Sequence, residues 1–161
     1  MNILFLQTGG TIDKDYPRSQ GGYAFEFGEP ATLRILEQLD PSFEFEVDTV
    51  CQKDSQELTD LDREHLATRI RASSIDRVIV THGTDTLLDT AYYLEHRVSD
   101  KLVILTRAMR PQRFSNSDAP VNLGVALGAA SLLKSGVYVA MHGLVKPAPQ
   151  MCRDPDTGKF Q

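Results

Sequence analysis

The sequence has little of several features that would assign a class of protein on their own. Its 161 residues include only two cysteines, Cys51 and Cys152, which are too few for a disulfide framework and form no C-x-x-C pair. We interpret both as reduced, structural thiols. The four histidines show no metal-ligand spacing, and no apolar run approaches the roughly 20 residues that a membrane-spanning helix needs. A disulfide-stapled fold, a histidine metal site and a membrane span are therefore not expected.

An excess of positive charge is also missing. The formal net charge is -5, which argues against a nucleic-acid backbone as the main partner but does not exclude a small zwitterionic substrate. The N-terminus lacks the basic start and long apolar region of a secretory signal, and the chain has no internal repeat. Taking the N-terminus as native, we expect a cytoplasmic protein with no nucleic-acid and no membrane partner.

What is present is the composition of an ordinary folded domain. Apolar residues make up 41% and charged residues 24% of the chain, and its length suits a single domain spanning residues 1–161. Short apolar runs alternate with segments of helical periodicity. The predicted strands are residues 2–7, 43–50, 77–81, 101–106 and 137–141, and the predicted helices are residues 30–39, 59–72, 86–97 and 121–135.

This alternation predicts an α/β fold, with a parallel sheet of about five strands and helices on both faces, as in a Rossmann-like or flavodoxin-like three-layer sandwich. The strand at 43–50 alternates apolar and acidic residues, which indicates an edge. Residues 13–29 have no periodicity, and paired glycines precede Tyr23. We expect a flexible active-site loop there. Residues 142–161 are expected to be irregular.

The first predicted strand ends in the motif TGGTI at residues 8–12. Two glycines let the backbone turn sharply and approach a ligand, and the hydroxyl of Thr11 follows directly. Loops at the carboxyl ends of parallel strands are where ligands bind in such sheets. When the motif is considered alone, an ordinary glycine turn is favoured over a catalytic role, because such turns are common. It is neither a P-loop nor a dinucleotide-binding motif.

Two further motifs at strand ends favour a functional site. HGTDT at residues 82–86 places Thr84 and Asp85 between a strand and a helix, and DSQE at residues 54–57 follows another strand. Asp85 could cap the helix or hold a substrate ammonium group, while Ser55 and Gln56 offer donors and acceptors for a carboxylate or amide. Because parallel strands end at one edge of a sheet, we expect these groups to lie together.

The motifs TGGTI, DSQE, THGTDT and AMRP, in this order over nearly the whole chain, resemble those of the bacterial-type L-asparaginases and their asparaginase/glutaminase relatives. The resemblance is to the N-terminal domain, as in a short single-domain member. It implies an amidohydrolase that converts L-asparagine to L-aspartate and ammonia through a threonine acyl-enzyme. It implies a small amino-acid amide as substrate, and no metal or cofactor. Because closed dimers are the commonest assembly, we also expect a homodimer or higher homo-oligomer.

The resemblance further implies a role for each matching residue. Thr11 would be the acylated nucleophile, and Tyr23 would help its proton transfer. Asp85 would bind the α-ammonium group, and the backbone N–H of Thr84 would help form the oxyanion hole. The implied catalytic residues are therefore Thr11, Tyr23, Thr84 and Asp85, and the implied substrate-binding residues are Gly10, Ser55, Gln56, Asp85 and Ala108, the last through its carbonyl.

Two departures from the family pattern affect these expectations. Longer members have a C-terminal domain that lends an acidic residue to a neighbouring subunit's site, and this sequence ends near the expected linker. The family's lysine partner of the Thr-Asp pair aligns with Arg153, which cannot act as a base, so Lys146 or Lys159 is the alternative.

Other interpretations of the sequence stay open beside the leading one. His82 is expected to pack and hydrogen-bond rather than to catalyse, because nothing pairs it with a nucleophile. Two functions compete with an amidohydrolase that acts alone. One is a non-catalytic aspartate- or asparagine-binding module, and the other is an amidase subunit that supplies ammonia to a partner.

Overall fold

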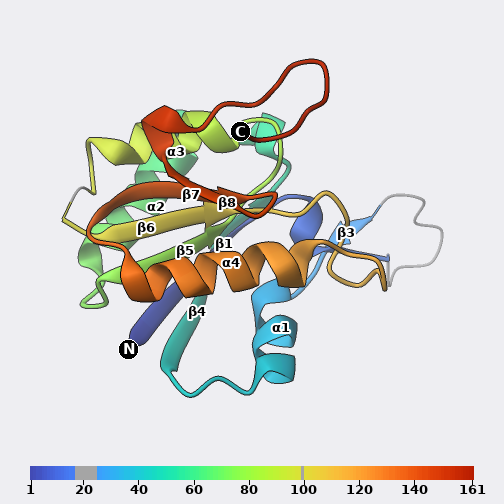
Figure 1. Cartoon of the computed structure of the whole chain (residues 1–161), viewed down its shortest axis with the longest axis horizontal. Helices are drawn as coiled ribbons and strands as arrows, with labels where there is room; N and C mark the ends of the chain where they lie inside the picture. The colour runs from blue at the N-terminus through green and yellow to red at the C-terminus, as the bar shows by residue number, and fades with distance from the viewer. Residues whose placement is uncertain (17–24, 99) are drawn as a thin grey trace.

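A computed structural model describes residues 1–16, 25–98 and 100–161. Its main sheet has six strands in the order β4-β1-β5-β6-β7-β8 (Figure 1). Five strands are parallel, and β8 runs antiparallel to β7 at one edge. The parallel sheet and the edge position of β4 are as predicted. In chain order the strands are β1 (Asn2–Gly9), β4 (Glu44–Lys53), β5 (Arg77–Thr81), β6 (Leu102–Thr106), β7 (Gly136–Met141) and β8 (Leu144–Pro147).

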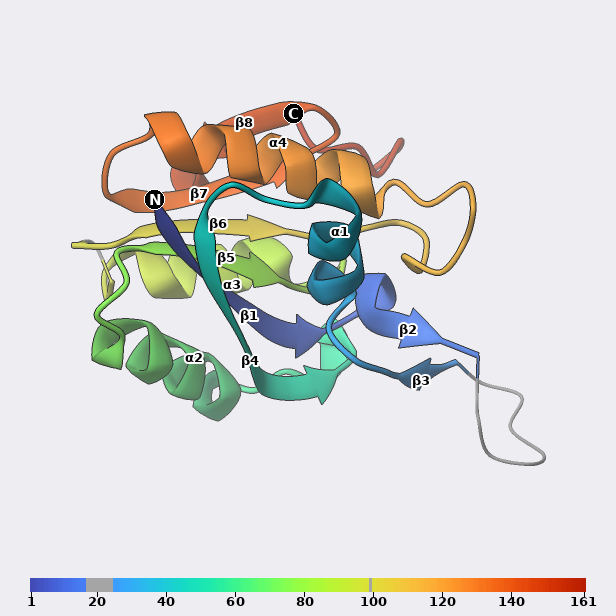
Figure 2. The same ribbon diagram turned by 90° about the horizontal axis from the view of Figure 1, so that it is seen from below.

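Helices cover both faces of the sheet, as predicted (Figure 2). Helices α1 and α4 pack on one face, and α2 and α3 pack on the other. In β1 the side chains of Ile3 and Phe5 pack in the hydrophobic core beneath α1 and α4. Those of Leu4 and Leu6 pack in the core beneath α2 and α3. Such a strand has no polar face, as is usual for buried parallel strands. The helices are α1 (Ala31–Leu39), α2 (Asp60–Ala72), α3 (Leu87–Glu95) and α4 (Ala119–Leu132).

Helix α2 begins with a capping box. The Thr59 hydroxyl accepts a hydrogen bond from the backbone N–H of Asp62, and the Asp62 carboxylate accepts one from the N–H of Thr59. Two N–H groups that the first turn leaves unpaired are thereby satisfied. Within the described residues no helix is long and apolar enough to cross a membrane.

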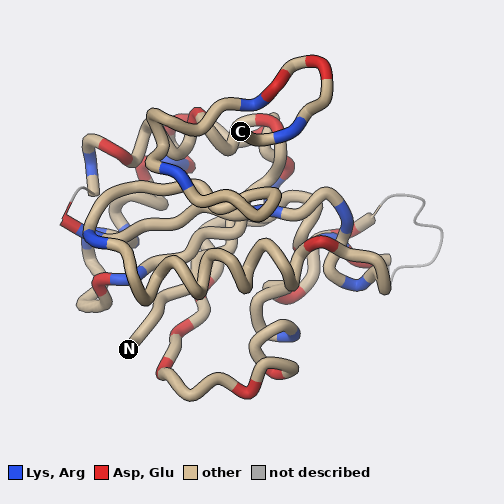
Figure 3. The backbone as a smooth tube through the Cα atoms, viewed as in Figure 1, with Lys and Arg blue, Asp and Glu red and all other residues tan. Residues whose placement is uncertain are grey.

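Helix α4 carries no charged residue, so its tube is uniformly tan in Figure 3. The small residues of α4 divide between its two sides. Ala126 and Ala130 are buried in the core, whereas a Cβ on Gly124 or Gly128 would meet no atom within 4 Å. The alanines therefore make the close packing, and the glycines face outward.

The prediction of an irregular segment from residue 142 is wrong for β8 and for the 3₁₀ turn η3 (Ala148–Gln150) that follows it. His142 and Gly143 connect β7 to β8 as a two-residue turn, with φ values of 53° and 81°. Positive φ at both residues matches the twist of a hairpin. Four residues are too few for a strand periodicity to be visible in the sequence.

A second small sheet lies in the region predicted to be an irregular loop. Strand β2 (Lys14–Asp15) pairs antiparallel with β3 (Glu26–Phe27). This pairing spans two residues on each strand, which is too short to leave a sequence signal.

The strand order places a topological switch between β1 and β5. From β1 the chain passes through α1 to the edge strand β4, and then returns past β1 to β5, β6 and β7. The helices that follow β1 and β5 lie on opposite faces of the sheet. Loops that diverge in this way leave a crevice at the carboxyl ends of the strands, where ligands bind in such folds.

Candidate active site

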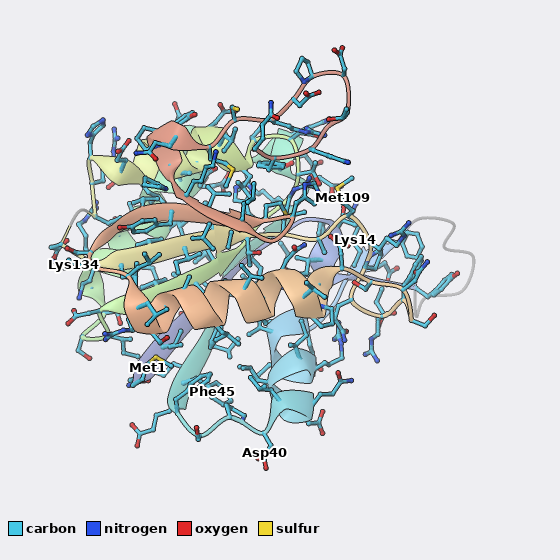
Figure 4. All side chains as sticks on the ribbon, viewed as in Figure 1. Met1, Lys14, Asp40, Phe45, Met109 and Lys134 are labelled. Carbon is cyan, nitrogen blue, oxygen red and sulfur yellow. The ribbon has the colours of Figure 1, made fainter. Side chains whose placement is uncertain are left out.

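A pocket of about 450 Å³ opens at the carboxyl ends of β1, β4, β5 and β6. This size is typical of small-molecule sites. Met109 and Lys14 mark this end of the molecule in Figure 4, and Lys134 marks the opposite end. The pocket combines the residues expected from three separate motifs. Its lining residues are Thr11, Asp54, Ser55, Gln56, Gly83, Thr84, Asp85 and Met109.

Glycines allow the three loops to meet. Gly10 has a φ of 82°, and a Cβ there would collide with the backbone of Gly83. A Cβ on Gly83 would in turn collide with Ser55. The glycines of TGGTI and HGTDT therefore serve loop packing, which brings the residues after β1, β4 and β5 into one pocket.

Thr11 is the first residue of the 3₁₀ turn η1 (Thr11–Asp13), directly after the Gly10 turn. Its side chain is half-buried and lines the pocket. Among the described residues its hydroxyl has no hydrogen-bond partner, in contrast to the hydroxyls of Thr8 and Thr81 nearby. A hydroxyl held in a pocket without a structural bond is available to react with a ligand.

Ser55 and Gln56 connect the loop after β4 to Asp85. The Ser55 hydroxyl accepts a hydrogen bond of 2.9 Å from the backbone N–H of Asp85, and its carbonyl accepts one of 2.6 Å from the Thr86 hydroxyl. The side-chain amide of Gln56 donates to Asp85 Oδ2 over 2.7 Å. These bonds fix the Asp85 carboxylate and leave the Ser55 hydroxyl proton free to donate.

The Asp85 carboxylate also has a cationic partner. Arg153 Nη1 lies 3.2 Å from Asp85 Oδ1. The hydrogen bond from Gln56 and the interactions with Arg153 lower the pKa of Asp85, although partial burial raises it. Asp85 is therefore ionised and paired near neutral pH.

Thr84 is paired with an arginine that sequence reasoning missed. Arg107 directly follows β6, and its Nη1 donates to the Thr84 hydroxyl oxygen. Arg107 is 0% exposed, and its guanidinium lies 4.8 Å from the Phe160 ring centroid. Burial, followed by repulsion from Arg153, lowers its pKa to about 10, so it stays charged at neutral pH. The signal in the sequence that could have identified Arg107 is its position directly after a buried strand.

Gly10 and Ala108 border the pocket without being among its lining residues. The N–H of Gly10 donates to the Lys53 carbonyl, and its carbonyl accepts from Asp13, so both of its backbone groups have partners within the fold. Ala108 is 1% exposed and belongs to the core under α4. Its neighbour Met109 lines the pocket, held by a backbone N–H bond to Asp118.

His82 has the packing and hydrogen-bonding role expected for it. Its Nδ1 lies 2.8 Å from the Gly83 carbonyl, and its Nε2 lies 2.9 Å from the Thr90 hydroxyl. Since a carbonyl only accepts, Nδ1 carries the proton and Nε2 accepts from Thr90. Complete burial lowers its pKa to about 4, so the ring is neutral at pH 7.

The buried Asp13 side chain holds the 3₁₀ turn that carries Thr11 against its neighbouring elements. Its Oδ1 accepts from the backbone N–H of Ala31 at the start of α1, and its Oδ2 accepts from the Thr81 hydroxyl. Burial outweighs these bonds and raises its pKa to about 6. The carboxylate thus connects β5 and α1 to the turn that carries Thr11.

The sequence also matches a known protein family over most of its length. A family model described as the N-terminal part of asparaginase matches residues 2–153. The chain belongs to the asparaginase N-terminal domain family. It is 33% identical over 165 residues to a probable periplasmic L-asparaginase of Haemophilus influenzae, covering 97% of this chain and 47% of that relative. It is 28% identical to a glutamyl-tRNA(Gln) amidotransferase component of Methanococcus maripaludis, covering 88% of this chain and 35% of that relative.

Solved structures give the same assignment for the asparaginase N-terminal domain. The thermostable L-asparaginase of Thermococcus kodakarensis superposes with a TM-score of 0.85 at 28% identity, over 100% of this chain and 51% of that one. The chain therefore spans about half the length of the curated relatives it matches.

Arg153, Lys146 and Lys159 are the three candidates for the position of the family lysine. Arg153 contacts Asp85, whereas the Thr84 hydroxyl is contacted by Arg107. Among the described residues, neither Lys146 nor Lys159 makes a side-chain hydrogen bond or ion pair with Thr84 or Asp85. Tyr23, the predicted loop tyrosine, lies outside the described residues.

Proposed function

We propose that this chain is an amidohydrolase that releases ammonia from the carboxamide of a small acid of the L-asparagine type, with Thr11 as nucleophile. The observation that carries the proposal is that the Thr11 hydroxyl, which has no hydrogen-bond partner among the described residues, lies in a pocket with Ser55, Gln56, Thr84 and Asp85. The family relationship supports the same class of reaction.

The proposed reaction has two stages. Thr11 Oγ attacks the amide carbon, the amide nitrogen leaves as ammonia, and an ester to Thr11 remains. Water then hydrolyses the ester, releasing the acid and restoring the hydroxyl. A threonine hydroxyl needs a proton acceptor, and on the sequence resemblance we assign that role to Tyr23. No step requires a metal or a cofactor.

The negative charge that develops on the carbonyl oxygen requires fixed donors. Among the described residues the backbone N–H of Thr84 has no hydrogen-bond partner, which supports its proposed place in an oxyanion hole. The carbonyl of Ala108 likewise has no partner there, which supports its proposed contact with the leaving amide.

Ammonia release from L-asparagine and L-glutamine, assayed side by side, tests the proposal. The two amides differ by one methylene, which is worth about 1–3 kcal/mol of pocket discrimination. We expect release from at least one small carboxamide by the purified chain. Saturable binding in calorimetry with no ammonia released would instead support the binding module.

A second candidate follows from the amidotransferase component among the relatives. In that case the chain would supply ammonia to a partner and would be active only in its presence. Turnover by the purified chain alone would remove this candidate.

A further inference from the structure

A side chain from outside the pocket contacts a residue that lines it. Arg107 is 0% exposed, and its Nη1 donates a hydrogen bond to the hydroxyl oxygen of Thr84. Thr84 is half-buried and lines the pocket, whereas Arg107 is not among the lining residues. An effect of Arg107 on a bound ligand must therefore pass through Thr84.

The packing around Arg107 directs its guanidinium to this bond. The Phe160 ring centroid lies 4.8 Å from the guanidinium carbon, which is within the range of a cation–π interaction, and Phe160 is 3% exposed. The backbone N–H of Phe160 donates to His142 Nδ1 over 3.2 Å, which connects the ring to the β7–β8 turn. The Arg107 carbonyl accepts a bond of 3.0 Å from Asn122 of α4. Nε and Nη2 have no hydrogen-bond partner among the described residues, so within that part of the chain the side chain donates through Nη1 to Thr84.

Arg107 keeps its positive charge in this buried position. Burial and repulsion from Arg153 lower its pKa to about 10, while Asp118 and Asp85 act in the opposite direction. The guanidinium is therefore charged at neutral pH, with carboxylates near it.

The bond from Arg107 fixes how Thr84 can act on a ligand. An arginine side chain only donates, so the Thr84 oxygen is the acceptor and its own proton is left for an acceptor in the pocket. Anchoring this oxygen also restricts the backbone N–H of the same residue. That N–H has no hydrogen-bond partner among the described residues and is the group assigned to the oxyanion hole in the proposed reaction. Such a donor is most effective when its direction is fixed before charge develops.

We propose that Arg107 is a positioning residue for the amidohydrolase reaction, which acts through the Thr84 hydroxyl to hold the Thr84 N–H toward the oxyanion. This inference rests on the proposed function and adds a residue to it. Because the oxyanion exists only in and after the transition state, loss of Arg107 should lower kcat and leave KM nearly unchanged.

The first test is the kinetics of two Arg107 variants with the better substrate of L-asparagine and L-glutamine. Arg107→Met should lower kcat by at least about thirtyfold, with KM within about threefold of the wild type. Arg107→Lys keeps the charge and a donor but not the planar geometry, and should lower kcat by only about three- to tenfold. The matched control is Arg77→Met at the amino end of β5, which removes a partly buried arginine whose Nε donates to the Ala130 carbonyl. Its kcat should stay within about threefold of the wild type.

A double-mutant cycle decides whether the effect passes through Thr84. Thr84→Val removes the acceptor oxygen while keeping the shape of the side chain. In the Thr84→Val chain, Arg107→Met should lower kcat further by less than about threefold. If the Met variant does not fold, Arg107→Lys takes its place in the cycle. Effects of the Arg107 and Thr84 changes that multiply in full would overturn the proposal.

The motion of the Thr84 N–H gives a readout that does not depend on turnover. Its ¹⁵N order parameter should be about 0.85 in the wild type and fall below about 0.6 in Arg107→Met, with no change in Arg77→Met. The same direction of change is expected for Arg107→Lys. An unchanged order parameter, or a kcat of Arg107→Met within about threefold of the wild type, would contradict the positioning role. No ammonia from either amide with the wild type would instead refute the amidohydrolase function, while the order parameter would still decide whether Arg107 holds Thr84.

Discussion

Two buried titratable side chains beside the pocket have pKa values shifted in opposite directions. Asp13 is raised to about 6 and His82 is lowered to about 4, in both cases mainly by burial. Both are therefore closer to neutrality in the fold than in the unfolded chain. At neutral pH His82 contributes no charge to the pocket, and the ionised Asp13 destabilises the folded state.

The contribution of Asp13 to stability depends on pH in a defined direction. Its pKa is about 6 in the fold against an ordinary value of 3.8, so the stability it contributes is full below pH 3.8 and is lost as the pH rises through 6. This change amounts to about 3 kcal/mol. Asn can keep the bonds to Ala31 and Thr81 without titrating.

We therefore predict that Asp13→Asn gains stability relative to the wild type by up to about 3 kcal/mol between about pH 4 and about pH 7.5. Urea unfolding of both proteins at the two pH values measures the difference. The opposite effect of His82 is common to both proteins and cancels. A difference that does not change with pH would contradict the raised pKa.

Single residues differ in how far the sequence could predict their roles. Thr11, Ser55 and Asp85 could be predicted to lie together because each follows a predicted strand. The pairing of Arg107 with Thr84 and of Arg153 with Asp85 joins residues 23 and 68 positions apart. No local pattern encodes such contacts. The family resemblance suggested Arg153 as a partner of this pair, whereas the contact of Arg107 appears only in the folded chain.

At the level of elements, the buried strands and the α2 capping box could be predicted because their signals are local. The β7–β8 hairpin could not, because it depends on a two-residue turn at His142 and Gly143 rather than on periodicity. The loops of TGGTI and HGTDT could be predicted to lie near each other, but their tight packing could not. It depends on Gly10 and Gly83 lying against each other.

This loop contact gives a prediction for Gly10→Ala. The φ of 82° and the collision with Gly83 should together destabilise the fold by about 2 kcal/mol or more and displace Thr11 from the pocket. Urea unfolding and ammonia release measure the two effects. In the matched control Gly124→Ala, the new methyl group enters open space on α4 and should stabilise the fold by about 0.5–1 kcal/mol. Equal stability of the two variants would contradict the role assigned to the glycine contact.

At the level of the whole molecule, the fold places the three motifs at the switch between β1 and β5, where diverging loops leave room for a ligand. The class of fold was predictable from the alternation of strands and helices. Assembly is a separate expectation. On the prevalence of closed dimers we predict a homodimer or higher homo-oligomer. Light scattering should give at least about twice the mass of the chain, and a monomer at every concentration would contradict this expectation.

The most direct test of the central claim is the effect of Thr11→Ala on ammonia release from L-asparagine and L-glutamine. With Thr11 as nucleophile, kcat/KM for the better substrate should fall by at least about a thousandfold, while Thr11→Ser keeps measurable turnover. Thr68→Ala, at an exposed hydroxyl on α2, should leave the rate unchanged. Turnover by Thr11→Ala within about tenfold of the wild type would contradict the assignment of Thr11 as the attacking residue.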